Sequence, residues 1–184
     1  MRNFTASLLH TAWTEDEKSQ LDKTINFVEE YDDEDFLTAA CHYLYHILGI
    51  DHIHIGLTLG IGSLKQIHTL VKLESGVVSP AIYYSLNKSP FNKIYDNDFM
   101  YLPFGLSAMY PDFEAIKKYK YESFIGMPLL NSEDEPLGII VMLHKRIIER
   151  GGFVEALLNA LIPKIETELL VKKINFDVQV EPSN

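Results

Sequence analysis

The N-terminal part of the chain carries two stretches with helical periodicity. Thr14 and Glu17 have the spacing of a capping box, in which the two residues satisfy each other's backbone N–H groups. The apolar residues that follow share one stripe: Leu21, Ile25 and Val28. A second run starts with the acids of DDEDF and ends at Gly49, a residue type that favours the left-handed C-cap position. The pattern predicts two consecutive helices.

The period then changes from helical to two. In HIHIGLTLG, residues 52–60, isoleucine and leucine alternate with histidine, glycine and threonine, which predicts a strand with one apolar and one more polar face. Gly60 and Gly62 supply a turn, and KQIHTLVKL follows as a second strand. His54 and Thr58 lie on the polar face of the first strand, and we expect their side chains to face any pocket on that side.

The C-terminal part predicts a hairpin followed by a long helix. SFIGMPLL and PLGIIVMLH are apolar nearly throughout and flank the turn NSEDEP, as expected of central strands that are covered on both faces. Residues 151–174, GGFVEALLNALIPKIETELLVKKI, have helical periodicity, and Pro163 should weaken or bend that helix.

Apolar residues of this last helix form a seam at alternating spacings of four and three: Val154, Leu158, Leu161, Ile165 and Leu169. Such a seam could pack against a second copy of the chain, which makes these residues candidates for a dimer interface. It could equally pack on the protein's own sheet.

The segment from about Glu74 to Tyr121 has no long periodic element and is rich in aromatic residues. A connection of this length is typical of a binding loop or a lid. YPDFEAIKKY predicts a short helix with Pro111 at its first position. The aromatic residues are Tyr83, Tyr84, Phe91, Tyr95, Phe99, Tyr101, Phe104, Tyr110 and Phe113. They could line a small-molecule pocket, or they could fill the core under an irregular segment.

Composition limits the function. The 184 residues, 47% of them hydrophobic, suit one globular domain with flanking helices. The formal net charge of −10 disfavours nucleic acid and anionic membranes as partners. Cys41 is the only cysteine, so a disulfide within the chain, a CxxC pair and a thiolate zinc cluster are excluded, and a cytoplasmic location fits. No apolar run approaches the roughly 18 residues that a membrane span needs.

The histidines do not predict a metal site. His42 and His46 lie four residues apart on the second helix, and His52, His54 and His68 lie on the two strands. Neither group has a carboxylate or cysteine at ligand spacing. Buried, hydrogen-bonded histidine is the expected state, and we assign no metal ligand.

Several segments, in this order, resemble a GAF domain: LYHILGIDHIHIGL, YSLNKSPFNKIY, MYPDFEAIKKYKYESFIGMPLLNSEDEPLGIIVML and ALLNALIPKIETELL. The resemblance implies an α+β (α/β) fold, GAF/PAS-like, with a central antiparallel sheet of five or six strands. The N- and C-terminal helices would cover one face, and an irregular roof of loops and short helices would enclose a pocket on the other. It divides the chain into a helical extension (1–34), the GAF-like domain with its long helix (35–174) and a tail (175–184).

Departures from known GAF types narrow the function further. Free methionine sulfoxide reductases need a nucleophilic and a resolving cysteine, which Cys41 alone does not provide. Covalent bilin attachment needs a cysteine in the pocket region, which has none. NKSPFNKIYDND only loosely echoes the signature of cyclic-nucleotide GAF domains. No nucleophile elbow, phosphate-binding loop or dinucleotide fingerprint occurs.

Two hypotheses therefore stand beside each other. The first is a non-catalytic sensory domain of bacterial signal transduction, which forms a homodimer and binds a small cytosolic ligand. It would signal through its terminal helices to a protein in trans or to an output domain. The pocket candidates are His54, Thr58, Tyr83, Tyr101, Phe104, Tyr110, Phe113 and Phe124. The second is a structural dimerisation module whose pocket is filled. The identity of the ligand, and of any cofactor, stays open.

Overall fold

The computed structural model describes residues 12–60 and 62–180, so the first eleven and last four residues of the predicted extension and tail lie outside it. At its centre is an antiparallel sheet in which the strands follow the order β3-β2-β1-β7-β6-β5, and β4 pairs with the start of β2. The strands are β1 (His52–Leu59), β2 (Gln66–Glu74), β3 (Val77–Val78), β4 (Tyr83–Ser85), β5 (Met100–Leu102), β6 (Ser123–Leu130) and β7 (Pro136–His144). The predicted antiparallel sheet is confirmed.

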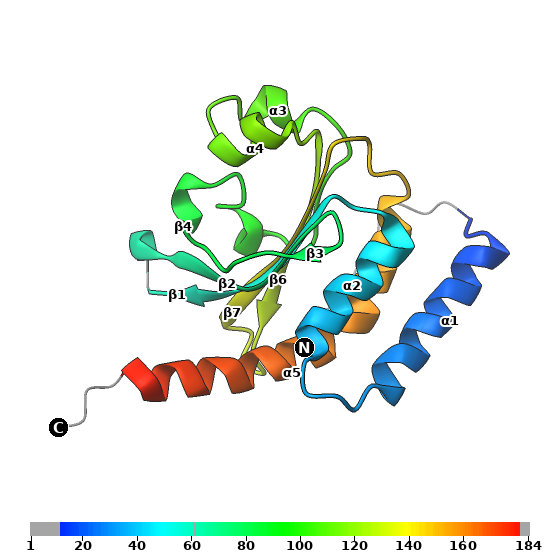
Figure 1. The fold of residues 1–184 in the computed structure, drawn as a ribbon, viewed down its shortest axis with the longest axis horizontal. Helices are drawn as coiled ribbons and strands as arrows, with labels where there is room; N and C mark the ends of the chain where they lie inside the picture. The colour runs from blue at the N-terminus through cyan, green and yellow to red at the C-terminus, as the bar shows by residue number, and fades with distance from the viewer. Residues whose placement is uncertain (1–11, 61, 181–184) are drawn as a thin grey trace.

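The three long helices cover one face of this sheet. They are α1 (Glu15–Glu30), α2 (Phe36–Leu48) and α5 (Gly151–Val180), and Figure 1 shows them together on one side, with α3, α4 and β4 on the other. The larger hydrophobic core lies between these helices and the sheet, where Leu44 of α2, Ile55 of β1 and Leu161 of α5 are fully buried. The predicted placement of the terminal helices is thus confirmed.

Helix α1 begins as its sequence predicts, but a different stripe faces the protein. Thr14 and Glu17 form the capping box. Thr24 is fully buried and bonds the hydroxyl of Tyr43 on α2, whereas Ile25 is 41% exposed. The predicted stripe was therefore wrong at Ile25, because α1 packs through threonine and aromatic contacts.

The predicted dimer seam on α5 lies inside the monomer. Val154, Leu158, Leu161, Ile165 and Leu169 are all at most 1% exposed and belong to the core that α5 shares with α2 and the sheet. The prediction that these residues form a dimer interface was wrong, since they bury their area against their own chain. Helix α5 also continues past Ile174 to Val180, so the first part of the predicted tail is helical. It contains Pro163 and changes direction along its course (Figure 1).

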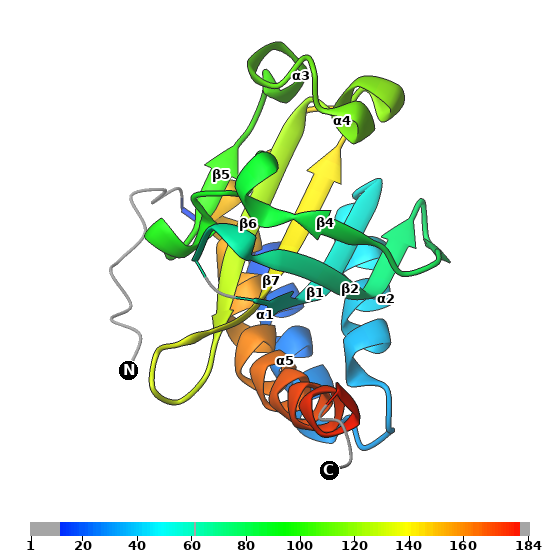
Figure 2. The ribbon, with the colours of Figure 1, turned by 90° about the vertical axis from the view of Figure 1, so that its left-hand side faces the viewer.

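A second core holds the roof against the opposite face. The roof consists of the single turns η2 (Leu86–Lys88) and η3 (Ile94–Asp96) and the short helices α3 (Leu106–Met109) and α4 (Glu114–Tyr119), while η1 (Gly62–Leu64) closes the β1–β2 turn. Phe91, Ile94 and Ile116 of the roof pack on Val141 and other sheet residues. Figure 2 shows α3 and α4 at one end of the molecule, and the C-terminal turns of α5 at the other. Helix α4 starts at Glu114, so Pro111 lies before it rather than at its first position.

The central strands β1, β6 and β7 are buried on both faces, which explains their apolar sequences. They also approach each other closely at two glycines. A Cβ atom on Gly138 of β7 would stand 2.2 Å from the carbonyl oxygen of Gly56 on β1 and would meet Leu169 of α5 as well. Gly138 therefore serves close packing between strand, strand and helix.

Candidate ligand-binding site

A cavity of about 470 Å³ lies between the sheet and the roof. Strand β1 contributes His52 and His54, and β2 contributes Lys72 and Glu74. These four side chains share one face because His52 pairs with Glu74, and His54 with Lys72, across the two antiparallel strands. Aromatic residues of β4 and of the segment between β4 and β6 supply most of the walls: Tyr84, Phe91, Phe113, Tyr119 and Tyr121. Such an apolar enclosure with a few convergent polar groups is the usual composition of a small-molecule site.

Two buried histidines form the floor of this cavity. Nε2 of His52 lies 2.9 Å from Nδ1 of His54, and Nε2 of His54 lies 2.9 Å from the hydroxyl of Tyr84. Burial lowers the pKa of His52 to about 4, and burial, together with the neighbouring His52 and Lys72, lowers the pKa of His54 well below its ordinary value. Both rings are therefore neutral at physiological pH.

The remaining nitrogen of His52 has no partner. Its Nδ1 atom is buried without a hydrogen bond among the described residues, and the nearest acidic oxygen, Oε1 of Glu74, is 4.0 Å away. Since His52 is neutral, this contact is not an ion pair. Leaving a buried polar group unpaired costs about 1–3 kcal/mol. Nδ1 of His52 itself has almost no accessible surface, so a ligand would contact it only if neighbouring side chains moved.

An ion pair between Lys72 and Glu74 lies beside the imidazole of His52. Nζ of Lys72 lies 3.2 Å from Oε1 of Glu74, and the hydroxyl of Ser79 donates to the other oxygen of that carboxylate. Burial alone would raise the pKa of Glu74, but the hydrogen bond and charge of Lys72 outweigh it and lower the pKa. The cavity thus presents a carboxylate, an ammonium group and a neutral imidazole close together.

Only part of the predicted pocket set lines this cavity. His54 and Phe113 do so, and Phe124 lies directly beneath, with its ring 5.1 Å from that of Phe91. Thr58 is buried on the same face, but its hydroxyl lies 2.5 Å from the hydroxyl of Tyr95. The hydroxyl of Tyr95 also donates a hydrogen bond to the carbonyl of Gly138. The polar face of β1 is therefore covered by the roof, as expected, although Thr58 does not reach the cavity.

The other four candidates lie elsewhere. Tyr83 is 58% exposed and stacks on His68, and Tyr110 borders a separate shallow depression beside the roof. Tyr101 donates its hydroxyl to the carbonyl of Ile148. Phe104 is 64% exposed. These predictions were wrong for this cavity because alternate residues of a short strand or loop point in opposite directions, so an aromatic segment cannot line one site with all of its rings.

Sequence reasoning assigned no site role to His52, Lys72, Glu74 or Tyr121. One signal was available for His52, since it alternates with His54 on the same face of the strand. Lys72 and Glu74 become neighbours of the histidines only through the register of β1 with β2. That register contains an irregularity between Ile55 and Gly56, which sequence periodicity does not reveal.

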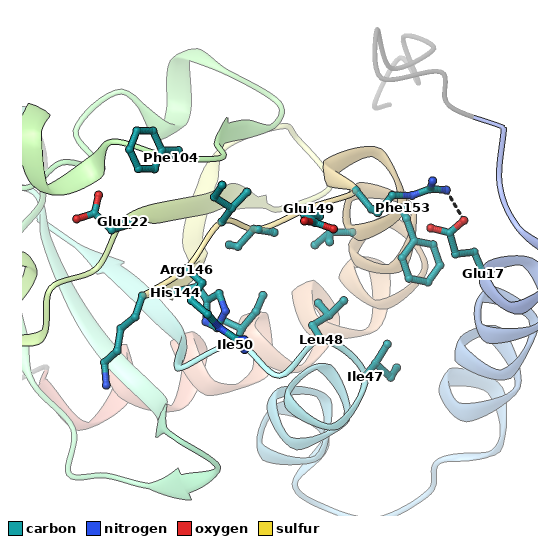
Figure 3. A pocket seen from close by; sticks show the side chains of 15 residues that line it. Glu17, Ile47, Leu48, Ile50, Phe104, Glu122, His144, Arg146, Glu149 and Phe153 are labelled. Carbon is teal, nitrogen blue, oxygen red and sulfur yellow. Dashed lines mark hydrogen bonds and ion pairs between the residues drawn. The ribbon is translucent and has the colours of Figure 1, made fainter.

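A larger groove, shown in Figure 3, lies at the end of the sheet between α2 and the start of α5. Phe104 borders it, and two of its polar side chains, Glu17 and His144, lie against partners within the protein. Glu17 is paired with Arg150 at the edge of α1. His144 lies 2.7 Å from Asp51. These two pairs connect α1 to the start of α5 and the end of β7 to the residue before β1.

Cys41 lies on α2 in the helix-side core and is fully buried. Burial raises the pKa of this thiol, so it provides no thiolate nucleophile. Among residues 12–60 and 62–180, no three histidine, cysteine or acidic side chains come together as a metal site would require. In the same part of the chain, no helix is both long and apolar enough to cross a bilayer.

Comparison with solved structures identifies the fold. The GAF domain of a phosphoenolpyruvate-protein phosphotransferase from Acinetobacter matches with a TM-score of 0.66 at 13% identity, over 90% of this chain and 99% of that one. The nlh2 GAF domain of A. aeolicus, in an inactive state, matches with a TM-score of 0.57 at 13% identity, over 85% and 96%. The free methionine-R-sulfoxide reductase of Neisseria meningitidis, in complex with its substrate, matches with a TM-score of 0.60 at 13% identity, over 90% and 97%.

No protein-family model and no curated protein matches the sequence. The structural similarity extends over most of each chain, and its arrangement of helices, sheet and roof is the one described above. The chain therefore has the fold of a GAF domain. At this level of identity the similarity establishes the fold, and function must be argued from the site.

Proposed function

We propose that this chain is a non-catalytic sensory domain that binds a small cytosolic molecule in the roofed cavity. The observation that carries the proposal is the cavity itself, which aromatic rings enclose and in which the imidazole of His52 and the Lys72–Glu74 ion pair lie close together. A ligand that packs against the aromatic walls would remove apolar surface from water, which stabilises the complex. The solved GAF domains support the fold of this proposal but not its ligand.

A path from the cavity to the terminal helices is built into β1. His52 and His54 face the cavity, and the alternating Ile53 and Ile55 face the core shared with α2 and α5. A shift of β1 on ligand binding would therefore act directly on the packing of these helices. Its size is limited by the difference between the ligand's affinities for the two states. The receiver would be a partner protein in trans or an output domain.

We favour a binding domain over an enzyme because the cavity lacks an activated nucleophile. The sulfoxide reductase with this fold acts on a substrate, but that chemistry needs a reactive thiol pair. The only thiol here, that of Cys41, is buried in the opposite core. The histidines are not placed beside a serine, threonine or cysteine hydroxyl or thiol that they could deprotonate.

Native mass spectrometry of the protein purified from its own host tests the proposal. The mass of each folded subunit is compared with the mass after denaturation. A reproducible additional small mass identifies a bound ligand, and its loss in a folded His52→Phe variant, which removes the imidazole nitrogens from the cavity lining, would assign it to this cavity. A folded wild-type protein that carries no additional mass in repeated preparations would contradict the proposal.

The structural dimerisation module remains a second candidate, supported by a different part of α5. The predicted seam is buried, but Leu170, Val171 and Ile174 are exposed on the C-terminal half of the helix. A homodimer formed through α5 would use these residues. A ligand-free mass at dimer stoichiometry would favour this candidate over the sensor.

A further inference from the structure

Two charged side chains of the cavity have hydrogen-bonding capacity that the protein does not use. Lys72 and Glu74 both line the cavity, and 12% and 33% of their side chains are exposed. The ammonium group carries three N–H donors, and its ion-pair partner among the described residues is Oε1 of Glu74, 3.2 Å away. The carboxylate also accepts from Ser79, and its two oxygens offer about four acceptor sites. A donor and an acceptor with free capacity therefore lie side by side.

The hydroxyl of Tyr121 is a third group with free capacity. Tyr121 lines the same cavity, its ring lies 5.9 Å from that of His52, and 3% of the residue is exposed. Its hydroxyl has no hydrogen bond among the described residues, yet it is not one of the unpartnered atoms that are sealed from solvent, so a small molecule can reach it. Burial, together with the carboxylates of Glu74 and Asp51, raises the pKa of Tyr121, so the hydroxyl keeps its proton.

The charges that line the cavity balance each other. Lys72 is paired with Glu74, and α4 contributes one further cation and one further anion, the exposed Lys118 and Glu114. The two histidines of the floor are neutral at physiological pH because burial lowers their pKa values. A charged ligand beside the Lys72–Glu74 pair would meet a like charge as well as an opposite one, and burying an incompletely compensated charge is unfavourable. The cavity therefore favours an uncharged ligand.

We infer that the cavity binds an uncharged, flat molecule that carries a hydrogen-bond acceptor and a donor side by side, as a lactam or a primary amide does. The carbonyl oxygen of this molecule accepts from Lys72, its N–H donates to Glu74, and the hydroxyl of Tyr121 bonds the same edge. A flat ring suits the aromatic walls, because stacking removes its faces from water. This inference rests on the proposed function, since it names the chemistry of the molecule that the same cavity would bind.

Four probes of the same shape test the class of ligand: benzamide, acetophenone, benzoate and benzamidine. Each is titrated to millimolar concentration, and binding is followed through the NMR resonances of the cavity residues in isotope-labelled protein. We expect benzamide to bind most tightly. Acetophenone keeps the ring and the carbonyl oxygen but lacks the donor to Glu74, so it should bind at least about tenfold more weakly. Binding of acetophenone, of the anion benzoate or of the cation benzamidine as tight as that of benzamide would overturn the inference.

Tyr121→Phe tests the part that the hydroxyl plays in selection. The variant keeps the ring, and we expect it to bind benzamide about two- to tenfold more weakly than the wild type. Because the hydroxyl has no partner among the described residues, the midpoint of denaturant unfolding should stay the same. Tyr83→Phe is the matched control, since Tyr83 is exposed and lies outside the cavity lining. Unchanged affinity in Tyr121→Phe, with or without a lower midpoint, would remove Tyr121 from the site.

Glu74→Gln tests the charge balance. It removes the anion that faces Lys72, so benzoate should now bind more tightly than benzamide. An unchanged order of affinities in the folded variant would overturn the role of the ion pair.

The failure of this inference can be told apart from the failure of the proposed function. If none of the four probes binds the folded wild type, the assigned class of ligand is wrong. Native mass spectrometry detects a natural ligand of any chemistry, so it decides the proposed function separately. A natural ligand that is charged would support that function and overturn the class assigned here.

Discussion

Lowering the pH should destabilise this protein through its buried histidines. Burial lowers the pKa of His52 from an ordinary value of 6.5 to about 4, and the pKa of His54 is lowered in the same direction. Between these two pKa values the unfolded chain therefore binds a proton at His52 that the folded protein does not bind. The stability that these neutral rings provide is fully present above about pH 6.5, and it is lost as the pH falls through the folded-state pKa.

The size of the effect follows from the two pKa values of His52. A group with these values in the unfolded and folded states accounts for about 2 kcal/mol of stability lost between about pH 7 and pH 5. His54 adds to the loss in the same range. Carboxylates with lowered pKa values, such as that of Glu74, lose their contribution at lower pH, where they become protonated. The range between about pH 5 and pH 7 therefore reports mainly on histidine.

Denaturant titration at several pH values in this range measures the free energy of unfolding directly. His52→Gln removes one titrating ring, so its free energy should depend on pH less steeply than that of the wild type by about 2 kcal/mol over the same interval. His46→Gln, on the exposed side of α2, is the matched substitution outside the cavity. Equal slopes for His52→Gln and the wild type would refute the assignment of a neutral, buried His52.

Three further outcomes can be measured on the same protein. Tyr95→Phe loses the hydrogen bonds to Thr58 and to the carbonyl of Gly138, and it should lower the free energy of unfolding by about 1–3 kcal/mol in denaturant titration; an unchanged midpoint would contradict this. Leu158→Ala should cost about 2–5 kcal/mol without changing the number of subunits, whereas dissociation of a dimer would show that the residue also serves an interface. In light scattering at tens of micromolar, we expect a dimer that Val171→Glu converts to a monomer with little loss of stability, and a monomeric wild type would exclude the dimer.

Local signals predicted most of the fold. The capping box at Thr14 and the left-handed C-cap at Gly49 both occur where the sequence places them. These signals depend only on residues within one or two helical turns of each other, so they can be recognised without knowing the rest of the fold. The nearly unbroken apolar sequences of β6 and β7 likewise predicted strands covered on both faces, because burial on two sides removes the alternation.

The sequence by itself therefore determined the order of the long helices and of the central strands β1, β2, β6 and β7, and its single cysteine excluded a site built on a pair of thiols. Only the tertiary structure decided which side chains meet. It placed the seam of Leu158 inside the monomer and brought Glu74 opposite His52, because packing and strand register depend on contacts between residues far apart in the chain. It also placed the hydroxyl of Tyr84, on β4, within hydrogen-bond distance of His54 in the floor of the cavity. Periodicity gives the face of a strand, but the partner that covers that face is chosen by the whole fold.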